Sequence, residues 1–158
     1  MDILRNSIVA LLLLVSVASS TPVDATRDLL DAIEYRDGDR FLELMSESVR
    51  AQIELSYRKL KELAAEDPGM AETLFNELGI NITVCDIEWM TTGDFITVML
   101  GGVHLPPAEN VISEEASLNG RTAVVVFTWD SGYTLTFRLS WEESDWKVTG
   151  TSVLDQLF

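Results

Sequence analysis

Few residues in this sequence could act as a proton donor, a proton acceptor or a nucleophile. His104 is the only histidine and Cys85 is the only cysteine. An imidazole titrates near neutral pH, but a catalytic one needs a partner that orients it. A thiol becomes a nucleophile beside a histidine or within a Cys-x-x-Cys pair, and neither pattern is present. We therefore assign no catalytic residue, and we expect His104 to be a surface or loop-packing residue and Cys85 a small buried one.

A cluster of acids in the middle of the chain could in principle bind a cation. Asp86, Glu88 and Asp94 would meet if this segment folded back on itself. Their spacing lacks the alternating oxygen ligands and the glycine of a calcium loop. The single cysteine also excludes a cysteine metal cluster and an intramolecular disulfide. We predict a solvated acidic surface, with no metal and no cofactor.

A group of aromatic residues near the C-terminus could bind a ligand. Aromatic rings bury a large apolar area, and tyrosine and tryptophan add a polar group at one end. Such side chains could line a cavity under covering helices, or they could simply fill the core. The predicted ligand-binding residues are Phe127, Trp129, Tyr133, Phe137 and Trp141.

These aromatic residues fall within predicted strands between residues 110 and 150. Asn119-Gly120 and Asp130-Ser131-Gly132 are turn signals between apolar runs. From residue 133 to 141 apolar and polar residues alternate, which predicts one buried and one wetter face. We expect Arg138, on the polar face, to pair with a neighbouring acid or to mark a sheet-to-sheet dimer contact. The predicted apolar face of this strand consists of Tyr133, Leu135, Phe137, Leu139 and Trp141.

The residues before the strands have helical patterns. Thr21 is a predicted N-cap, followed by Pro22 at the first helical position and Asp24 in the first turn. Gly38 is predicted to end this helix in a left-handed conformation, and Asp39 to cap the next one.

Further helices are predicted in the middle of the chain. Apolar residues at helical spacing predict a helix over 51–66, and Asp67-Pro68 begins another that stops at Gly79. Residues 80–100 fit either short helices or a hairpin, and we favour helices. The whole pattern predicts an α+β fold, with N-terminal helices packed on a curved antiparallel C-terminal sheet.

The first twenty residues predict export. Arg5 precedes the apolar run 8–15, which is followed by Ala18-Ser19-Ser20. This run is shorter than the roughly 20 apolar residues of a membrane span, and it fits a cleaved secretory signal peptide. The predicted organisation is a signal peptide at 1–20 and one domain at 21–158. The mature domain should then be secreted or extracytoplasmic, without stable membrane insertion after cleavage.

The charge of the chain limits its partners. Twenty-six acids against eleven lysines and arginines give a net charge of −15. Nucleic acids and anionic membranes would be repelled by this charge. We therefore predict no nucleic-acid partner.

Two segments of the sequence resemble a known superfamily. The first is TPVDATRDLLDAIEYRDGDRFLELMS at 21–46, and the second is YTLTFRLSWEESDWKVTG at 133–150. With these two segments, and with helices that precede an antiparallel meander, the chain resembles the NTF2-like (cystatin-like α+β cone) superfamily, particularly its small secreted members of uncharacterised function. The helices around 51–100 would be an elaboration of that fold.

The resemblance implies a conical pocket that serves isomerase or dehydratase chemistry, ligand binding or protein association. The isomerase branch has a tyrosine on the first helix, where Asp31 falls here, and the dehydratase branch needs a His/Asp pair. We therefore expect a non-enzymatic domain that binds a small apolar ligand or a protein partner. The alternatives are a pocket enzyme using carboxylate acid–base chemistry and a homodimer formed through the sheet.

Overall fold

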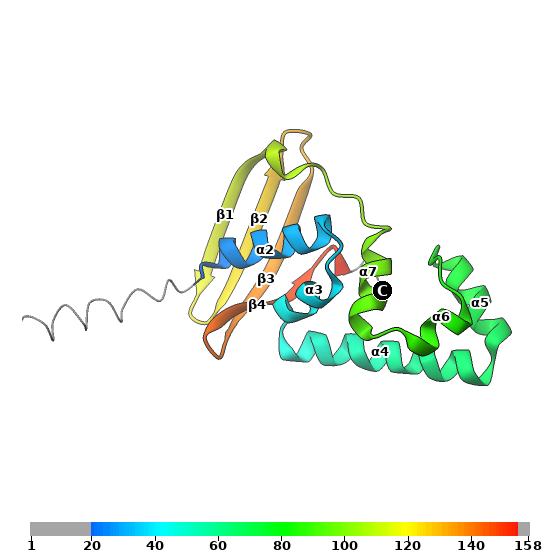
Figure 1. Ribbon diagram of the computed structural model, residues 1–158. Helices are drawn as coiled ribbons and strands as arrows, with labels where there is room; N and C mark the ends of the chain where they lie inside the picture. The colour runs from blue at the N-terminus through cyan, green and yellow to red at the C-terminus, as the bar shows by residue number, and fades with distance from the viewer. Residues whose placement is uncertain (1–19, 155–158) are drawn as a thin grey trace, which may run out of the picture.

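The computed structural model describes residues 20–154, which form helices packed against a four-stranded antiparallel sheet (Figure 1). The predicted α+β class is confirmed, while the predicted signal peptide at 1–20 lies outside the described residues except for Ser20. None of the described helices is both long and apolar enough to cross a membrane. The helices are α2 (Pro22–Glu34), α3 (Gly38–Leu44), α4 (Glu47–Glu66), α5 (Pro68–Glu77), α6 (Val84–Trp89), α7 (Thr92–Leu100) and the short η1 (Ala108–Asn110). The strands are β1 (Val111–Asn119), β2 (Thr122–Trp129), β3 (Thr134–Glu142) and β4 (Asp145–Thr151).

The sheet is a meander in which each strand pairs with the next, in the order β1-β2-β3-β4. Gly120 closes the first hairpin with a φ of 61°, a left-handed conformation that glycine adopts without steric cost. Helix α2 crosses one face of the sheet, here called the inner face, and the opposite face is called the outer face (Figure 1). The predicted alternation in β3 is confirmed, because Leu135, Phe137 and Leu139 are buried on the inner face.

Three helices begin with the same capping box, in which a threonine and an aspartate three residues later bond to each other's backbone N–H. The pairs are Thr21 with Asp24 on α2, Thr83 with Asp86 on α6, and Thr91 with Asp94 on α7. Hydrogen bonds from the threonine lower the pKa of each aspartate, since they stabilise the ionised carboxylate.

Replacing Asp94 with asparagine is expected to lower the melting temperature at pH 7. A lowered folded-state pKa stabilises the fold above the unfolded pKa of aspartate, about 3.9, and this contribution is lost as the pH falls through the folded pKa. The difference between wild type and Asp94→Asn should therefore shrink at pH 3 and below. Thermal unfolding followed by circular dichroism measures it, and a difference independent of pH would contradict the carboxylate's role.

The connection between α2 and α3 differs from the prediction. Helix α2 already ends at Glu34, and Arg36 takes the left-handed conformation, with a φ of 56°. Asp37, rather than Asp39, caps α3 through a hydrogen bond to the backbone N–H of Arg40. Gly38 is the first residue of α3 instead of the end of α2. Its lack of a side chain allows α7 to pack closely against it.

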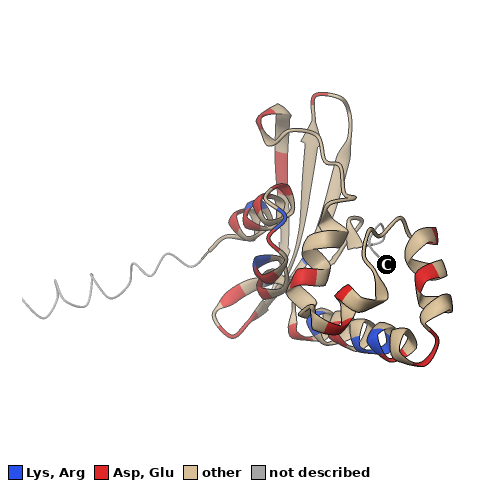
Figure 2. Ribbon diagram, turned by 45° about the vertical axis from the view of Figure 1, so that its right-hand side comes forward, with Lys and Arg blue, Asp and Glu red and all other residues tan. Residues whose placement is uncertain are grey.

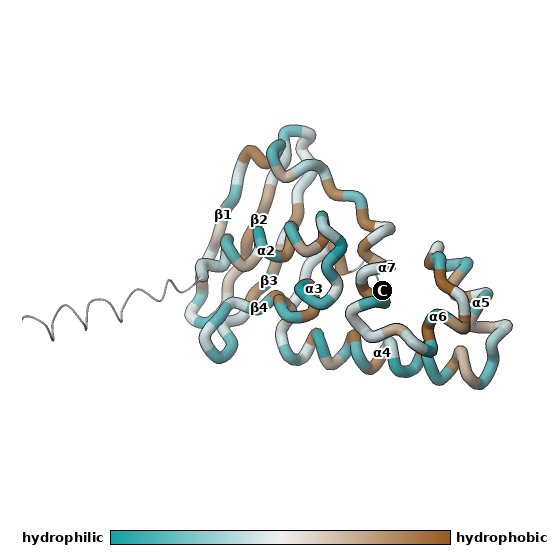
Figure 3. Tube along the Cα trace, viewed as in Figure 1, coloured by the Kyte–Doolittle hydropathy of each residue, from teal (hydrophilic) through white to brown (hydrophobic). Residues whose placement is uncertain are grey.

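Helix α4 runs from the sheet to the helices that lie farthest from it (Figure 1). It starts beside β4, where Met45 and Val148 form a parallel bridge and the Ser46 N–H donates to the Val148 carbonyl oxygen at 2.9 Å. The tube in Figure 3 shows hydrophobic and hydrophilic residues alternating along α4, as expected for a helix with one buried side.

Tyr57, on the far half of α4, contacts both α6 and α7. The hydroxyl of Tyr57 lies 2.8 Å from the Met90 carbonyl oxygen and 3.2 Å from that of Ile87, and its ring stacks on Phe95 at 4.9 Å. Burial, and then the nearby Asp94 carboxylate, raise the pKa of Tyr57, so its hydroxyl stays protonated. The preference for helices over residues 80–100 is confirmed by α6 and α7.

Candidate functional site

The five aromatic residues predicted to bind a ligand all lie on or beside the inner face of the sheet. Three of them, Phe127, Trp129 and Phe137, are at most 1% exposed, whereas Tyr133 and Trp141 are half-buried. Phe127 meets Phe137 edge-on at 6.0 Å, and Trp129 meets Tyr133 at 5.6 Å. The central rings therefore pack against one another as part of the core, and their contact with a ligand stays a prediction.

One cavity of about 410 Å³ lies where the end of α2 meets the connection between α7 and β1, and we call it the His104 cavity. Trp129 contributes to its wall and donates its indole N–H to the Pro107 carbonyl oxygen at 3.0 Å. His104 is exposed and lines this cavity together with Glu34 and Glu109. Residues capable of acid–base chemistry thus share one cavity, although Glu34 is far from His104 and Glu109 in the sequence.

A larger cavity of about 490 Å³ lies between α4 and the outer face of β3 and β4, and we call it the α4–sheet groove. The Ser46–Val148 hydrogen bond fixes the start of α4 beside β4, and this anchor positions the helical wall of the groove. Its lining is Val49, Gln52, Ile53 and Ser56 from α4, Thr136 and Arg138 from β3, and Thr149, Gly150, Thr151, Ser152 and Leu154 from β4 and the residues after it.

Among the lining residues in the described part of the chain, Arg138 is the only charged one. A β-bulge at Thr149 shifts the register of β4, so that Arg138 faces Gly150, and the Thr149 hydroxyl donates to the Arg138 carbonyl oxygen at 3.1 Å. A Cβ on Gly150 would lie 3.9 Å from a guanidinium nitrogen of Arg138. The absence of a side chain at this position leaves open space beside the guanidinium group.

The predicted pairing of Arg138 with a neighbouring acid is not found among residues 20–154. No carboxylate in this range lies within 4.0 Å of its guanidinium group, whereas Arg27, Arg40 and Arg50 all have acidic partners. The reason lies in the register, because the cross-strand neighbours of Arg138 are Val124 and Gly150. The Arg138 side chain is exposed to the groove instead.

Other polar groups of the groove also lack protein partners within the described part of the chain. The hydroxyl groups of Ser56, Thr136 and Ser152 and the amide of Gln52 appear in none of its side-chain hydrogen bonds. These groups can donate to or accept from a bound molecule. The groove therefore combines polar groups with an apolar wall formed by Val49, Ile53 and Leu154.

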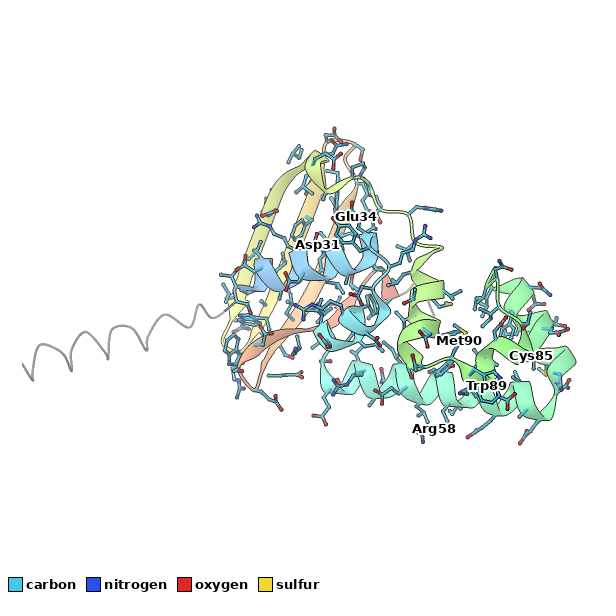
Figure 4. All side chains as sticks on the ribbon, viewed as in Figure 1. Asp31, Glu34, Arg58, Cys85, Trp89 and Met90 are labelled. Atoms are coloured by element: carbon cyan, nitrogen blue, oxygen red, sulfur yellow. The ribbon has the colours of Figure 1, made fainter. Side chains whose placement is uncertain are left out.

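The remaining sequence-predicted residues are separate from both cavities. Cys85 is exposed rather than buried, because the short helix α6 turns Ile87 inward and Cys85 outward. Figure 4 shows Cys85 on the side of α5 and α6, away from Asp31 and Glu34 on α2. Asp86 and Asp94 serve as capping residues, and no cluster of His, Cys, Asp and Glu within residues 20–154 is suited to a metal ion.

The α4–sheet groove was not predicted from the sequence. Its two walls are far apart in the chain, and only Arg138 on the polar face of a strand gave a local signal. Comparison with protein-family models, curated proteins and solved structures found no significant match to this chain.

Proposed function

We propose that this chain is a secreted, non-enzymatic binding domain of the NTF2-like type that holds a small molecule in the α4–sheet groove. The observation that carries this proposal is the groove itself, about 490 Å³ in volume and lined by polar groups without protein partners in residues 20–154. Ligand sites typically measure roughly 300–1,000 Å³ and combine apolar walls with a few polar groups.

Two other features support the fold and compartment in this proposal. Helices that precede a meander, with α2 across its inner face, agree with the NTF2-like arrangement, and α4 to α7 would be the elaboration. The apolar run at 8–15, followed by small residues, supports export. The net charge of −15 favours a neutral or weakly charged ligand over nucleic acid.

A second candidate function is acid–base catalysis in the His104 cavity. Its support is that His104 shares this cavity with the carboxylates of Glu34 and Glu109. A histidine and a carboxylate can act as proton donor and acceptor in one site. This alternative predicts that a bound molecule contacts the His104 cavity rather than the α4–sheet groove.

Native mass spectrometry of the exported protein tests the leading proposal. We expect the wild type to retain a small molecule from the expression host, and its polypeptide mass to begin near Thr21. Gly150→Val should lose this molecule, because valine is well tolerated in strands and its methyl groups would extend into the groove. Gly69→Val on the distant helix α5 is the matched control and should retain the molecule.

The other outcomes separate the competing functions. A molecule that is retained by Gly150→Val but lost by His104→Ala would move the site to the His104 cavity. A dimer without a bound molecule would favour association through the outer face of the sheet. In either case the groove would not be the binding site.

A further inference from the structure

The α4–sheet groove differs in charge from the rest of this acidic chain. The sequence has 26 acids and 11 lysines and arginines, and Figure 2 shows acids spread over helices and hairpins. Acids outnumber arginines in the other two cavities: the His104 cavity is lined by Glu34, Glu109 and Arg36, and a third cavity between α2 and α3 by Asp28, Asp31, Asp37 and Arg40. The groove, by contrast, has one arginine and no acid among the residues of 20–154 that line it.

We infer that the ligand of the groove is a small amphipathic carboxylate, and that Arg138 binds its carboxylate group. This inference rests on the proposed binding function of the groove and adds the chemical class of the ligand. A guanidinium group presents its N–H donors in a planar fork that matches the two oxygens of a carboxylate.

The surroundings of Arg138 fit the two ends of such a ligand. The Thr136 and Ser152 hydroxyls can donate to carboxylate oxygens, and Gly150 leaves room beside the guanidinium group. Val49, Ile53 and Leu154 provide apolar surface for a hydrocarbon part. Since no acid of residues 20–154 lines the groove, none of these carboxylates would repel a bound anion at direct contact.

One acid on α4, Glu54, already has a basic partner. Glu54 lies outside the groove lining and its carboxylate is 4.0 Å from the Arg50 guanidinium group. Arg50 and Arg138 are both exposed arginines, but only Arg138 lines the groove. Arg50 therefore offers a matched control for the removal of one positive charge.

Isothermal titration of the full chain with decanoate and with the uncharged decanamide tests the inference. Wild type should bind decanoate more tightly than decanamide. Arg138→Gln should weaken decanoate binding roughly ten- to a hundredfold, the range expected for a charged hydrogen bond, and leave decanamide binding unchanged. Arg138→Lys should recover part of the loss because it restores the charge but not the fork. Arg50→Gln should change neither affinity.

The outcomes distinguish this inference from the function on which it rests. If Arg138→Gln binds decanoate as tightly as wild type, or if decanoate does not bind wild type at all, the inference is overturned. The proposed function would still stand if Gly150→Val removed the molecule retained in native mass spectrometry. We also expect Asp155→Asn, which removes the acid that follows Leu154 in the sequence, to bind decanoate no more weakly than wild type. Weaker binding would contradict the assignment of the carboxylate to Arg138.

Discussion

Replacing Gly38 with alanine is expected to lower the free energy of unfolding by about 2–3 kcal/mol, the cost of overpacking a tight contact. The added Cβ would lie 2.0 Å from the Gly93 carbonyl oxygen and 2.7 Å from the Thr97 backbone nitrogen. Both are backbone atoms of α7, so the two helices would have to move apart. The Gly38 N–H also donates to the Thr97 hydroxyl at 3.1 Å, and this bond would be lost. Urea unfolding measures the effect.

Gly93→Ala is the matched control for this contact. Its Cβ would meet the carboxylate of Asp39, which is an exposed side chain that can rotate away. We therefore expect a smaller loss than for Gly38→Ala. Equal losses would contradict the proposed difference between a contact with the α7 backbone, which cannot move away on its own, and a contact with a side chain that can rotate.

Replacing Phe137 with alanine is expected to destabilise the fold by about 3–5 kcal/mol, the usual cost of removing a buried phenylalanine. The side chain is fully buried and contacts Phe127 edge-on. The same urea titration measures this loss. Thr136→Ala, one position earlier on the exposed face of β3, should change stability by less than about 0.5 kcal/mol.

The Phe137 variant also separates core packing from ligand contact. A residue that lines an open pocket would cost little stability when truncated, and its loss would appear mainly in ligand binding. A small change in stability with complete loss of the retained molecule would therefore move the site to the inner face.

The strands and most helices could be predicted because their signals are local. Alternation from residue 133 to 141 predicted the two faces of β3. Gly120, predicted to lie in a turn, and Gly79, predicted to end a helix, both have a positive φ. The capping threonine of α2 was predicted for the same reason, since the backbone N–H that donates to its hydroxyl oxygen belongs to Asp24, only three residues later.

The predictions that were wrong or missing concern residues whose structure depends on contacts with segments far away in the sequence. The role of Gly38 depends on α7, which approaches it so closely that no side chain fits. The groove likewise needs α4 beside β3 and β4, and nothing near Arg138 in the sequence shows that α4 lies there. The exposure of Cys85 depends on which side of the short α6 faces α4.

The bridge between Met45 and Val148 has a consequence for the order of folding. It joins the start of α4 to the last strand, two segments separated by most of the chain. During synthesis α4 leaves the ribosome long before its anchor exists. The groove can therefore form only after β4 has been translated, so truncations that remove β4 should abolish the groove even where the helices persist.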